Sequence, residues 1–265
     1  MNFQPSEPAK IAVVLLLARY LSLRTFDQID KFLIYIPALL IAAIPSGLVL
    51  MQPDLGTGLM IFVAGLAVIF VSGLPKRYVL LGVGVVVACI PIIWSQLYDY
   101  QKSRLLTFLN PEKDILGAGW QITQSKIALG SGGLFGKGFL QGSQSQLDYL
   151  PEKQTDFVFT LIGEEFGFIG NSAIIFVYFL IIISITGIGL KAKNRFIRLV
   201  ASGLAMVIFL YVFVNIAMVT GVLPVVGAPL PLLSYGGTAM LTVFVILGIS
   251  MNLSQNSQKE DLEIT

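Results

Sequence analysis

Apolar residues fall into seven long runs along the chain, separated by shorter polar stretches. The runs cover residues 9–22, 32–50, 57–74, 78–97, 158–189, 196–220 and 237–252. A helix needs about 20 apolar residues to cross a bilayer core, and most of the runs approach that length. The pattern predicts an all-α fold, that of a polytopic helical membrane protein with seven visible spans. The fifth run is too long for one straight crossing, so we expect its start to lie outside the membrane.

The composition supports this class and excludes others. Hydrophobic residues make up 55% of the chain and charged residues 12%, and the mean hydropathy is +0.83. A soluble domain is about a quarter charged, and at this size it could not hide so much apolar surface. The net charge of +2 is too small to suggest nucleic acid. There is no histidine, and the single Cys89 excludes a multi-cysteine metal site. Proton chemistry must therefore fall to carboxylates, lysines or tyrosines.

Basic residues gather on one side of the predicted spans. In the short loops of that side they are Arg19, Arg24, Lys31, Lys76, Arg77, Lys191, Lys193, Arg195 and Arg198. Since such loops face the cytoplasm, we expect a cytoplasmic C-terminus with a polar tail over 254–265. Residues 1–253 are expected to form a single integral membrane domain. Its one long outer loop, about 98–157, lies between the fourth and fifth spans. The odd span count puts Met1 outside, which hints that upstream spans are missing.

The outer loop contains two stretches of interest. Residues 114–129 have apolar positions at helical spacing, which predicts an amphipathic helix that lies in the membrane interface or packs onto the spans. Residues 130–138 are rich in glycine, and such backbone can approach a phosphate closely, with Lys137 adding charge. The GK[ST] ending of a Walker loop is absent. By physics alone, a flexible turn is the favoured interpretation of this stretch.

Asp156 stands where the polar loop meets the fifth apolar run. One interpretation is a helix cap, since an Asp at a helix start accepts from free amides and suits the dipole. The other is a partly desolvated carboxylate that faces an outer cavity and acts as a base. Thr160, Gly163 and Gly167 follow at i+4, i+7 and i+11. This narrow stripe of polar and small residues favours a face turned inward.

Other charged residues lie inside or at the head of spans. Glu164 and Glu165 lie two turns into the fifth run, where a carboxylate is either functional or solvated near the interface. Glu7 and Lys10, at i and i+3, can pair with each other, and a structural ion pair is the expected role. Asp54 is most simply the cap of the next span.

The last outer segment, residues 221–237, is apolar but contains three prolines and four glycines, which forbid a regular helix. Apolar, non-helical backbone at membrane depth is tolerated only where it is buried in protein or lines a cavity. This segment is the strongest purely physical pointer to a site. A passive plug is the alternative.

Together these stretches resemble the SEDS family of membrane glycosyltransferases (shape, elongation, division and sporulation proteins). The matching stretches are Gln4 to Glu7 with Lys10, Gln52 to Thr57, Gly117 to Gly138, Leu150 to Gly167, and Pro229 to Gly237. They occur in family order along nearly the whole chain, so the resemblance is specific. Pro224-Val225-Val226-Gly227 is more similar to the elongation branch than to the division branch.

The resemblance implies a peptidoglycan glycosyltransferase that polymerises lipid II on the outer face of the bacterial inner (cytoplasmic) membrane during cell elongation and shape control. The family's essential loop aspartate maps onto Asp156, which is the implied catalytic residue. The candidates for substrate binding are Glu7, Lys10, Lys126, Lys137, Lys153, Glu164, Glu165, Ser234 and Tyr235. Three of the lysines, Lys126, Lys137 and Lys153, would neutralise the leaving pyrophosphate.

The implied partners are lipid II, membrane lipids, and a class B penicillin-binding protein with the elongation machinery. No nucleic acid is expected. A divalent cation stays open as a cofactor, although no protein metal motif is visible in the sequence. The family has about ten spans of ~20 residues each, so we expect the N-terminal spans ahead of Gln4 to be missing.

Two other functions stay open. The first is transport, either as a lipid II flippase or as an ion-coupled carrier. A carrier should show repeat symmetry and key acids near mid-membrane, whereas no repeat is visible and Asp156 lies at the outer edge. The second is a truncated, non-catalytic scaffold of the elongation machinery.

Overall fold

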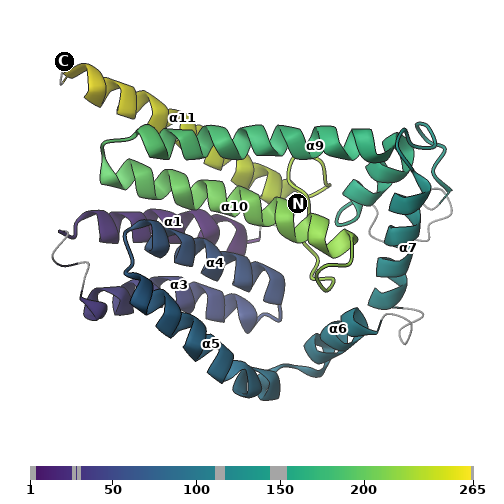
Figure 1. Ribbon diagram of the computed structural model, residues 1–265, viewed down its shortest axis with the longest axis horizontal. Helices are drawn as coiled ribbons and strands as arrows, with labels where there is room; N and C mark the ends of the chain where they lie inside the picture. The colour runs from purple at the N-terminus through teal and green to yellow at the C-terminus, as the bar shows by residue number, and fades with distance from the viewer. Residues whose placement is uncertain (1–3, 26–27, 29–30, 111–116, 144–153, 264–265) are drawn as a thin grey trace. The chain divides into compact units, whose positions relative to one another are not determined.

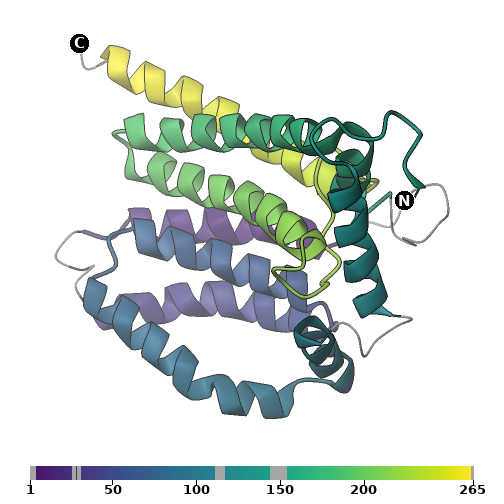
Figure 2. The ribbon, with the colours of Figure 1, turned by 45° about the vertical axis from the view of Figure 1, so that its right-hand side comes forward.

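The computed structural model describes residues 4–25, 28, 31–110, 117–143 and 154–263, and within these ranges it contains helices and no strands (Figures 1 and 2). In chain order the elements are α1 (Ser6–Ser22), the 3-10 helix η1 (Phe32–Ile34), α3 (Tyr35–Leu50), α4 (Leu55–Val71), α5 (Lys76–Gln96), α6 (Asp99–Leu109), α7 (Ala118–Ser131), α9 (Val158–Lys191), α10 (Arg195–Val219) and α11 (Gly237–Glu263). A helix covers each of the seven predicted runs. The fold is therefore that of a polytopic helical membrane protein, as predicted.

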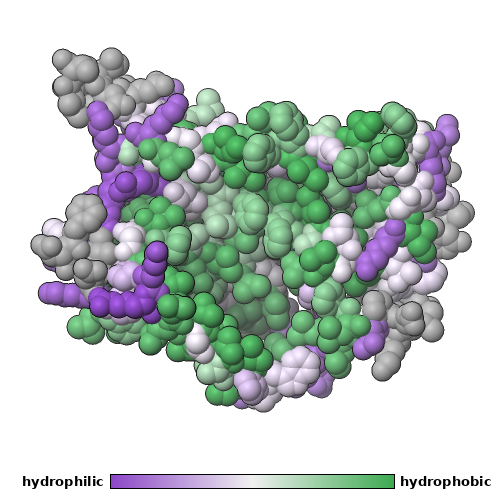
Figure 3. Space-filling model, viewed as in Figure 1, coloured by the Kyte–Doolittle hydropathy of each residue, from purple (hydrophilic) through white to green (hydrophobic). Residues whose placement is uncertain are grey.

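Among the residues that the structure describes, four helical segments are long and apolar enough to cross a membrane. They are Phe32–Leu50, Val158–Lys191, Arg195–Val219 and Gly237–Ser257. Large apolar side chains are exposed on several helices, including Leu80 (74% exposed) on α5 and Phe176 (58%) on α9. Figure 3 shows how much of one face is covered by hydrophobic residues. Such a surface suits contact with lipid chains in place of water.

The chain divides into two compact units. The first comprises Met1–Gln96, Ile181–Leu210 and Leu241–Thr265, and the second comprises Leu97–Leu180 and Tyr211–Met240. Three long helices, α9, α10 and α11, therefore contribute residues to both units. Asp156 and the predicted site residues that follow Gln96 belong to the second unit, whereas Glu7 and Lys10 belong to the first.

In the first unit, α1, α3 and α4 pack against one another over small residues. A Cβ atom at Gly65 of α4 would lie only 2.7 Å from the Cβ atom of Ala42 on α3, so glycine permits the close approach. Asp54 caps α4 as predicted, because its Oδ1 accepts a hydrogen bond of 3.0 Å from the Thr57 amide. Arg195 donates to the backbone carbonyls of Arg24 and Ser72, which fastens two loops of this unit.

Helix α9 is not one straight rod. Gly167 has φ 69° and ψ −164°, which breaks the helical backbone nine residues after Val158. The break divides the run, which we expected to be too long for one straight crossing, into two helical pieces. The placement of its start outside the membrane stays a prediction.

The long connection between α5 and α9 carries two helices, α6 and α7. The predicted helix over 114–129 is present as α7, although residues 111–116 lie outside the described ranges. The buried face of α7 carries Ile122, Ser125 and Ala128, while Ile127 is 48% exposed. The helix therefore packs onto protein through a face that combines apolar, small and polar residues. At the other end of the chain, α11 runs on to Glu263, so the predicted polar tail continues the last helix.

Candidate functional site

The break at Gly167 removes two helical hydrogen bonds from α9. In an unbroken helix the amide of Phe168 would donate to the carbonyl of Glu164, and that of Ile169 to Glu165. Buried backbone groups are almost always paired, so these four groups need other partners.

The glycine-rich loop over residues 132–138 supplies those partners. Four hydrogen bonds join the loop to the break, from Phe168 N to Gly133 O (2.9 Å), from Ile169 N to Leu134 O (3.2 Å), from Lys137 N to Glu164 O (3.0 Å) and from Gly138 N to Glu165 O (3.0 Å). The loop thus replaces both lost helical bonds with bonds of its own. It fixes the start of α9 to the outer connection.

The glycines of this loop are explained by its close approach to α9. A Cβ atom at Gly132 would lie 2.0 Å from the carbonyl oxygen of Gly163, and one at Gly136 would lie 2.1 Å from that of Glu165. Gly136 also has φ +78°, which favours glycine. The loop is therefore held against α9 and is not the flexible turn that we favoured. Its amides at positions 137 and 138 already donate to α9.

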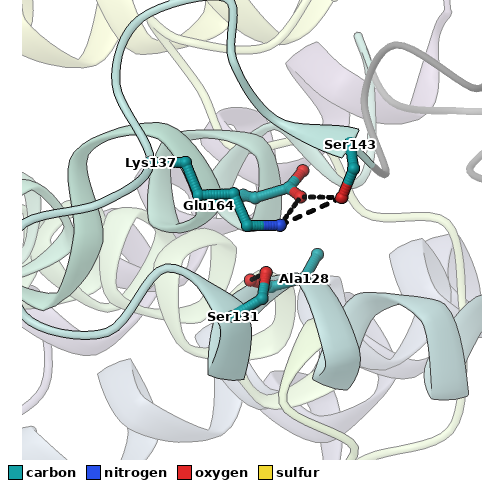
Figure 4. A network of polar contacts seen from close by, with 5 residues as sticks. All are labelled: Ala128, Ser131, Lys137, Ser143 and Glu164. Carbon is teal, nitrogen blue, oxygen red and sulfur yellow. Dashed lines mark hydrogen bonds and ion pairs between the residues drawn. The ribbon is translucent and has the colours of Figure 1, made fainter.

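Lys137, Ser143 and Glu164 form a polar cluster beside this junction (Figure 4). The Lys137 ammonium lies 2.7 Å from Glu164 Oε1 and 3.0 Å from Ser143 Oγ, and Ser143 Oγ donates to the same carboxylate oxygen at 3.2 Å. The Glu164 side chain is only 1% exposed, so the alternative of a solvated carboxylate does not hold for it. Glu165 is also buried. The charge of Lys137 is thus already balanced by a buried partner.

Asp156 lies just ahead of α9 and is half-buried. The carbonyl of Phe157 accepts from the Leu161 amide at 3.2 Å, which puts Phe157 in the N-cap position and Asp156 one residue before it. A Cβ atom built on Gly227 would lie 3.4 Å from Asp156 Oδ2. The carboxylate therefore faces the segment that follows α10.

That segment, residues 220–236, is non-helical as predicted. Its backbone and side chains are held by hydrogen bonds from Arg104 Nη1 to Val225 O (3.0 Å), Asn215 Nδ2 to Ala228 O (2.7 Å), Leu230 N to Ser234 Oγ (2.8 Å), Tyr235 N to Gln154 O (2.9 Å) and Tyr178 Oη to Pro231 O. Val225, Ala228 and Leu230 are buried. The expectation that this apolar backbone is enclosed by protein is confirmed for these residues.

Lys126 lies over the other end of the same segment. A Cβ atom at Gly221, where φ is +72°, would lie 2.3 Å from Lys126 Cε and 2.6 Å from Nζ. Within the part of the chain that the structure describes, Lys126 makes no ion pair. The nearby carbonyl of Val219, at the end of α10, accepts instead from Ser125 Oγ at 2.7 Å. Lys126 is an exposed residue.

A buried contact between α7 and α9 holds Lys126 and Asp156 near the same non-helical segment, residues 220–236. Ser125 Oγ and Thr160 Oγ1 lie 2.7 Å apart, and both residues are fully buried. Thr160 lies one turn after Asp156, and Ser125 precedes Lys126 directly. The inward orientation predicted for the stripe is confirmed for Thr160, and Gly163 and Gly167 are buried as well.

The remaining predicted residues have varied positions. Glu7 and Lys10 form the expected ion pair at 2.7 Å, with side chains 5% and 1% exposed. Ser234 is buried and accepts from the segment's own backbone, whereas Tyr235 is 84% exposed. Lys153 lies outside the described residues. Among the residues that are described, no three His, Cys, Asp or Glu side chains gather as a metal site would require.

Asn215 is a site residue that the sequence interpretation missed. It is fully buried on α10, and its Nδ2 donates to the Asp156 carbonyl at 2.8 Å and to the Ala228 carbonyl at 2.7 Å. Its signal in the sequence was a lone amide inside the apolar run 196–220. Polar groups at such depth are costly and need partners.

Fold and site together define a polytopic helical membrane protein in which a carboxylate and an ammonium lie along one non-helical segment. The sequence profile of the family described as cell cycle protein (FtsW, RodA and SpoVE) matches residues 1–259. The chain belongs to this family, the SEDS proteins of the resemblance above.

Named relatives and solved structures agree with this membership. The chain is 48% identical over 261 residues to the peptidoglycan glycosyltransferase MrdB of Escherichia coli (strain K12), a match that covers 96% of this chain and 68% of MrdB. The structure of the Thermus thermophilus rod shape determining protein RodA is similar with a TM-score of 0.67 and 28% identity, covering 97% of this chain and 67% of that one. A structure of a peptidoglycan synthase complex, described as coordinating polymerization and crosslinking, gives a TM-score of 0.79 at 30% identity, covering 97% and 71%.

Proposed function

We propose that this protein is a peptidoglycan glycosyltransferase that polymerises lipid II into glycan strands during cell elongation. The activity class follows from its family and from relatives such as MrdB. One observation carries the proposal for the site. The Asp156 carboxylate faces Gly227 and the Lys126 ammonium lies over Gly221, so an acid–base group and a cation line the same non-helical segment.

In the proposed reaction Asp156 is the general base. The 4-hydroxyl of the acceptor sugar attacks the anomeric carbon of the donor, and its proton passes to the Asp156 carboxylate. The new glycosidic bond forms as the bond from that carbon to the pyrophosphate oxygen breaks, with inversion. Undecaprenyl pyrophosphate leaves with the bonding electrons. The position of Asp156 before the N-cap of α9 supports this role, because its carboxylate is directed at the segment beyond α10.

Lys126 is the favoured group for stabilising the leaving pyrophosphate. A cation close to developing negative charge lowers the barrier, provided that the charge is not already neutralised. Lys126 meets this condition, whereas Lys137 is paired with the buried Glu164. Lys153, which lies in the long outer loop with Lys126 and Lys137, stays a candidate for the same role. Glu7 and Lys10, which form a buried ion pair, stay candidates for substrate binding, as the family motif implies.

The proposed setting is the bacterial inner membrane, with the site on the outer face and the C-terminus in the cytoplasm. The distribution of basic residues in the short loops supports this orientation. The proposed partner is a class B penicillin-binding protein, which would supply transpeptidation and activate the polymerase. The likeness to the peptidoglycan synthase complex supports such a pairing.

Labelled lipid II distinguishes the proposed polymerase from a flippase and a scaffold. The purified protein is incubated with labelled lipid II, with and without a class B penicillin-binding protein, and strand length is measured on gels. We expect glycan strands whose amount rises with the partner. Translocation of lipid II across vesicles without strand synthesis would favour the flippase, and neither activity would favour the scaffold. Either outcome would contradict the proposal.

A further inference from the structure

We infer that Asn215 is a positioning residue that fixes Asp156 relative to the non-helical segment, an inference that rests on the proposed role of Asp156 as the base. Asn215 belongs to α10, whereas the two carbonyls that it binds lie 59 residues before it and 13 residues after it. The side chain thus joins three parts of the second unit at one point.

The geometry of the Asn215 amide sets the distance between its two partners. Both hydrogens of a single NH₂ group are used, one for Asp156 O at 2.8 Å and one for Ala228 O at 2.7 Å. The angle between these hydrogens is fixed by the planar amide, so the two carbonyl oxygens are held at one separation. The flipped amide would point its own oxygen at both carbonyls, and the repulsion excludes that orientation.

The two bonded carbonyls lie next to the groups that face each other in the site. One belongs to Asp156, whose Oδ2 lies 3.4 Å from the Cβ position of Gly227, and the other belongs to Ala228, the next residue. A shift in the Asn215 bridge would therefore move the Asp156 carboxylate relative to Gly227. Misplacing a reacting group by about 1 Å can cost on the order of 10² in rate.

Burial makes the bridge hard to replace. Asn215 and Ala228 are both 0% exposed, so a displaced carbonyl would not find bulk water there. An apolar side chain of similar size would leave both carbonyls without their donor. The segment would then move to satisfy them, because buried unpaired carbonyls are unfavourable.

The test compares Asn215→Leu with Asn171→Leu. Asn171 is the matched control, since it is also a buried amide of the second unit but makes no hydrogen bond to Asp156 or to the segment within the described ranges. Strand synthesis is measured over a range of lipid II concentrations. For Asn215→Leu we expect kcat to fall about tenfold or more while KM stays within about twofold, and for Asn171→Leu we expect kcat to stay near the wild-type value.

A double variant tests whether Asn215 acts through the base. In the Asp156→Asn background, Asn215→Leu should cause no further loss, because the group that it positions is already gone. Multiplication of the two losses would overturn the inference, as would a wild-type kcat in Asn215→Leu. An equal fall in kcat for both Leu variants would also overturn it.

If Asn215→Leu does not accumulate, Asn215→Gln takes its place. This variant keeps both donors but displaces them by a methylene, so a wild-type kcat in it would overturn the inference.

Hydrogen exchange separates this inference from the proposed activity. Amides in 154–161 and 222–230 should exchange faster in Asn215→Leu, while those of α3 and α4 should be unchanged. Unchanged exchange in both stretches would overturn the positioning role whether or not the protein polymerises lipid II. If the wild-type protein makes no glycan strands but Asn215→Leu still exchanges faster in both stretches, the bridge is retained and the proposed function is rejected.

Discussion

A graded series of glycine substitutions tests the junction between the outer loop and α9. Gly130, Gly133 and Gly136 lie within seven residues of one another, but a methyl group meets different conditions at each. At Gly130, inside α7, a Cβ atom would have no neighbour within 4 Å. At Gly133 the space is also open, but φ is +54°. At Gly136 φ is +78° and the carbonyl oxygen of Glu165 would lie 2.1 Å away.

The magnitudes follow from these conditions. Gly130→Ala should be neutral or stabilising by up to about 1 kcal/mol, since alanine is the better helix former. Gly133→Ala should cost about 1–2 kcal/mol from backbone strain alone. Gly136→Ala adds a clash with backbone that cannot turn away, so the loop must separate from α9. Losing the two hydrogen bonds that Phe168 and Ile169 donate to the loop, at about 1–3 kcal/mol each, already brings the total cost to about 3 kcal/mol or more.

Thermal unfolding in detergent provides the ranking, and hydrogen exchange at Phe168 and Ile169 shows whether the junction itself has opened. We expect the stability order Gly130→Ala, then Gly133→Ala, then Gly136→Ala, with fast exchange at both amides only in the last. A Gly136→Ala variant as stable as Gly130→Ala, with both amides protected, would refute the account of the loop.

Three further predictions concern charge. Lys126→Met should lower kcat/KM for lipid II by about 10–100-fold while Lys126→Arg keeps most of it, because one charge-assisted contact is worth about 1.5–3 kcal/mol; equal activity of Lys126→Met and wild type would contradict this. In thermal unfolding, Lys137→Met should destabilise more than Glu164→Gln, because the carboxylate left behind is 1% exposed whereas the ammonium is 29% exposed and can reach water. A topology reporter fused after Arg195 should indicate cytoplasm and one near Gly142 the outer side, and the reverse pattern would reject the orientation.

Hydrophobic runs predicted the helices well because burial in lipid depends on local composition. The bounds of α3, α10 and the start of α11 lie within a few residues of the predicted runs. The cap at Asp54 and the ion pair Glu7–Lys10 were also predictable, since each depends on residues close in the chain. Local spacing decides such features.

The junction at Gly167 was not predictable in this way. A single glycine inside a helix costs only about 1 kcal/mol relative to alanine, so a glycine in an apolar run does not by itself indicate a break. The partners that satisfy the break lie about 30 residues away, in a loop that was interpreted as a flexible turn. The pairing of Lys137 with Glu164 depends on the same long-range contact. Such features follow from tertiary packing.

The candidate site was predicted in part. Asp156 and the proline-containing segment were identified separately, and the structure brings the carboxylate to Gly227. Lys126 and Lys137 could not be ranked from sequence, because they differ in whether a buried partner neutralises the charge. Asn215 was missed because its role depends on two carbonyls that are distant in the chain.

The most direct test of the central claim is strand synthesis by Asp156→Asn. Asp99→Asn serves as the control, because Asp99 is an exposed carboxylate at the start of α6 and has no role in the proposed reaction. Asparagine keeps the shape of the side chain but cannot accept the proton. With membrane level and thermal stability near wild type, we expect Asp156→Asn to lose on the order of 10²–10⁴ in the rate of glycan synthesis, and Asp99→Asn to lose none. Synthesis by folded Asp156→Asn at a rate close to wild type would contradict the assignment of Asp156 as the base.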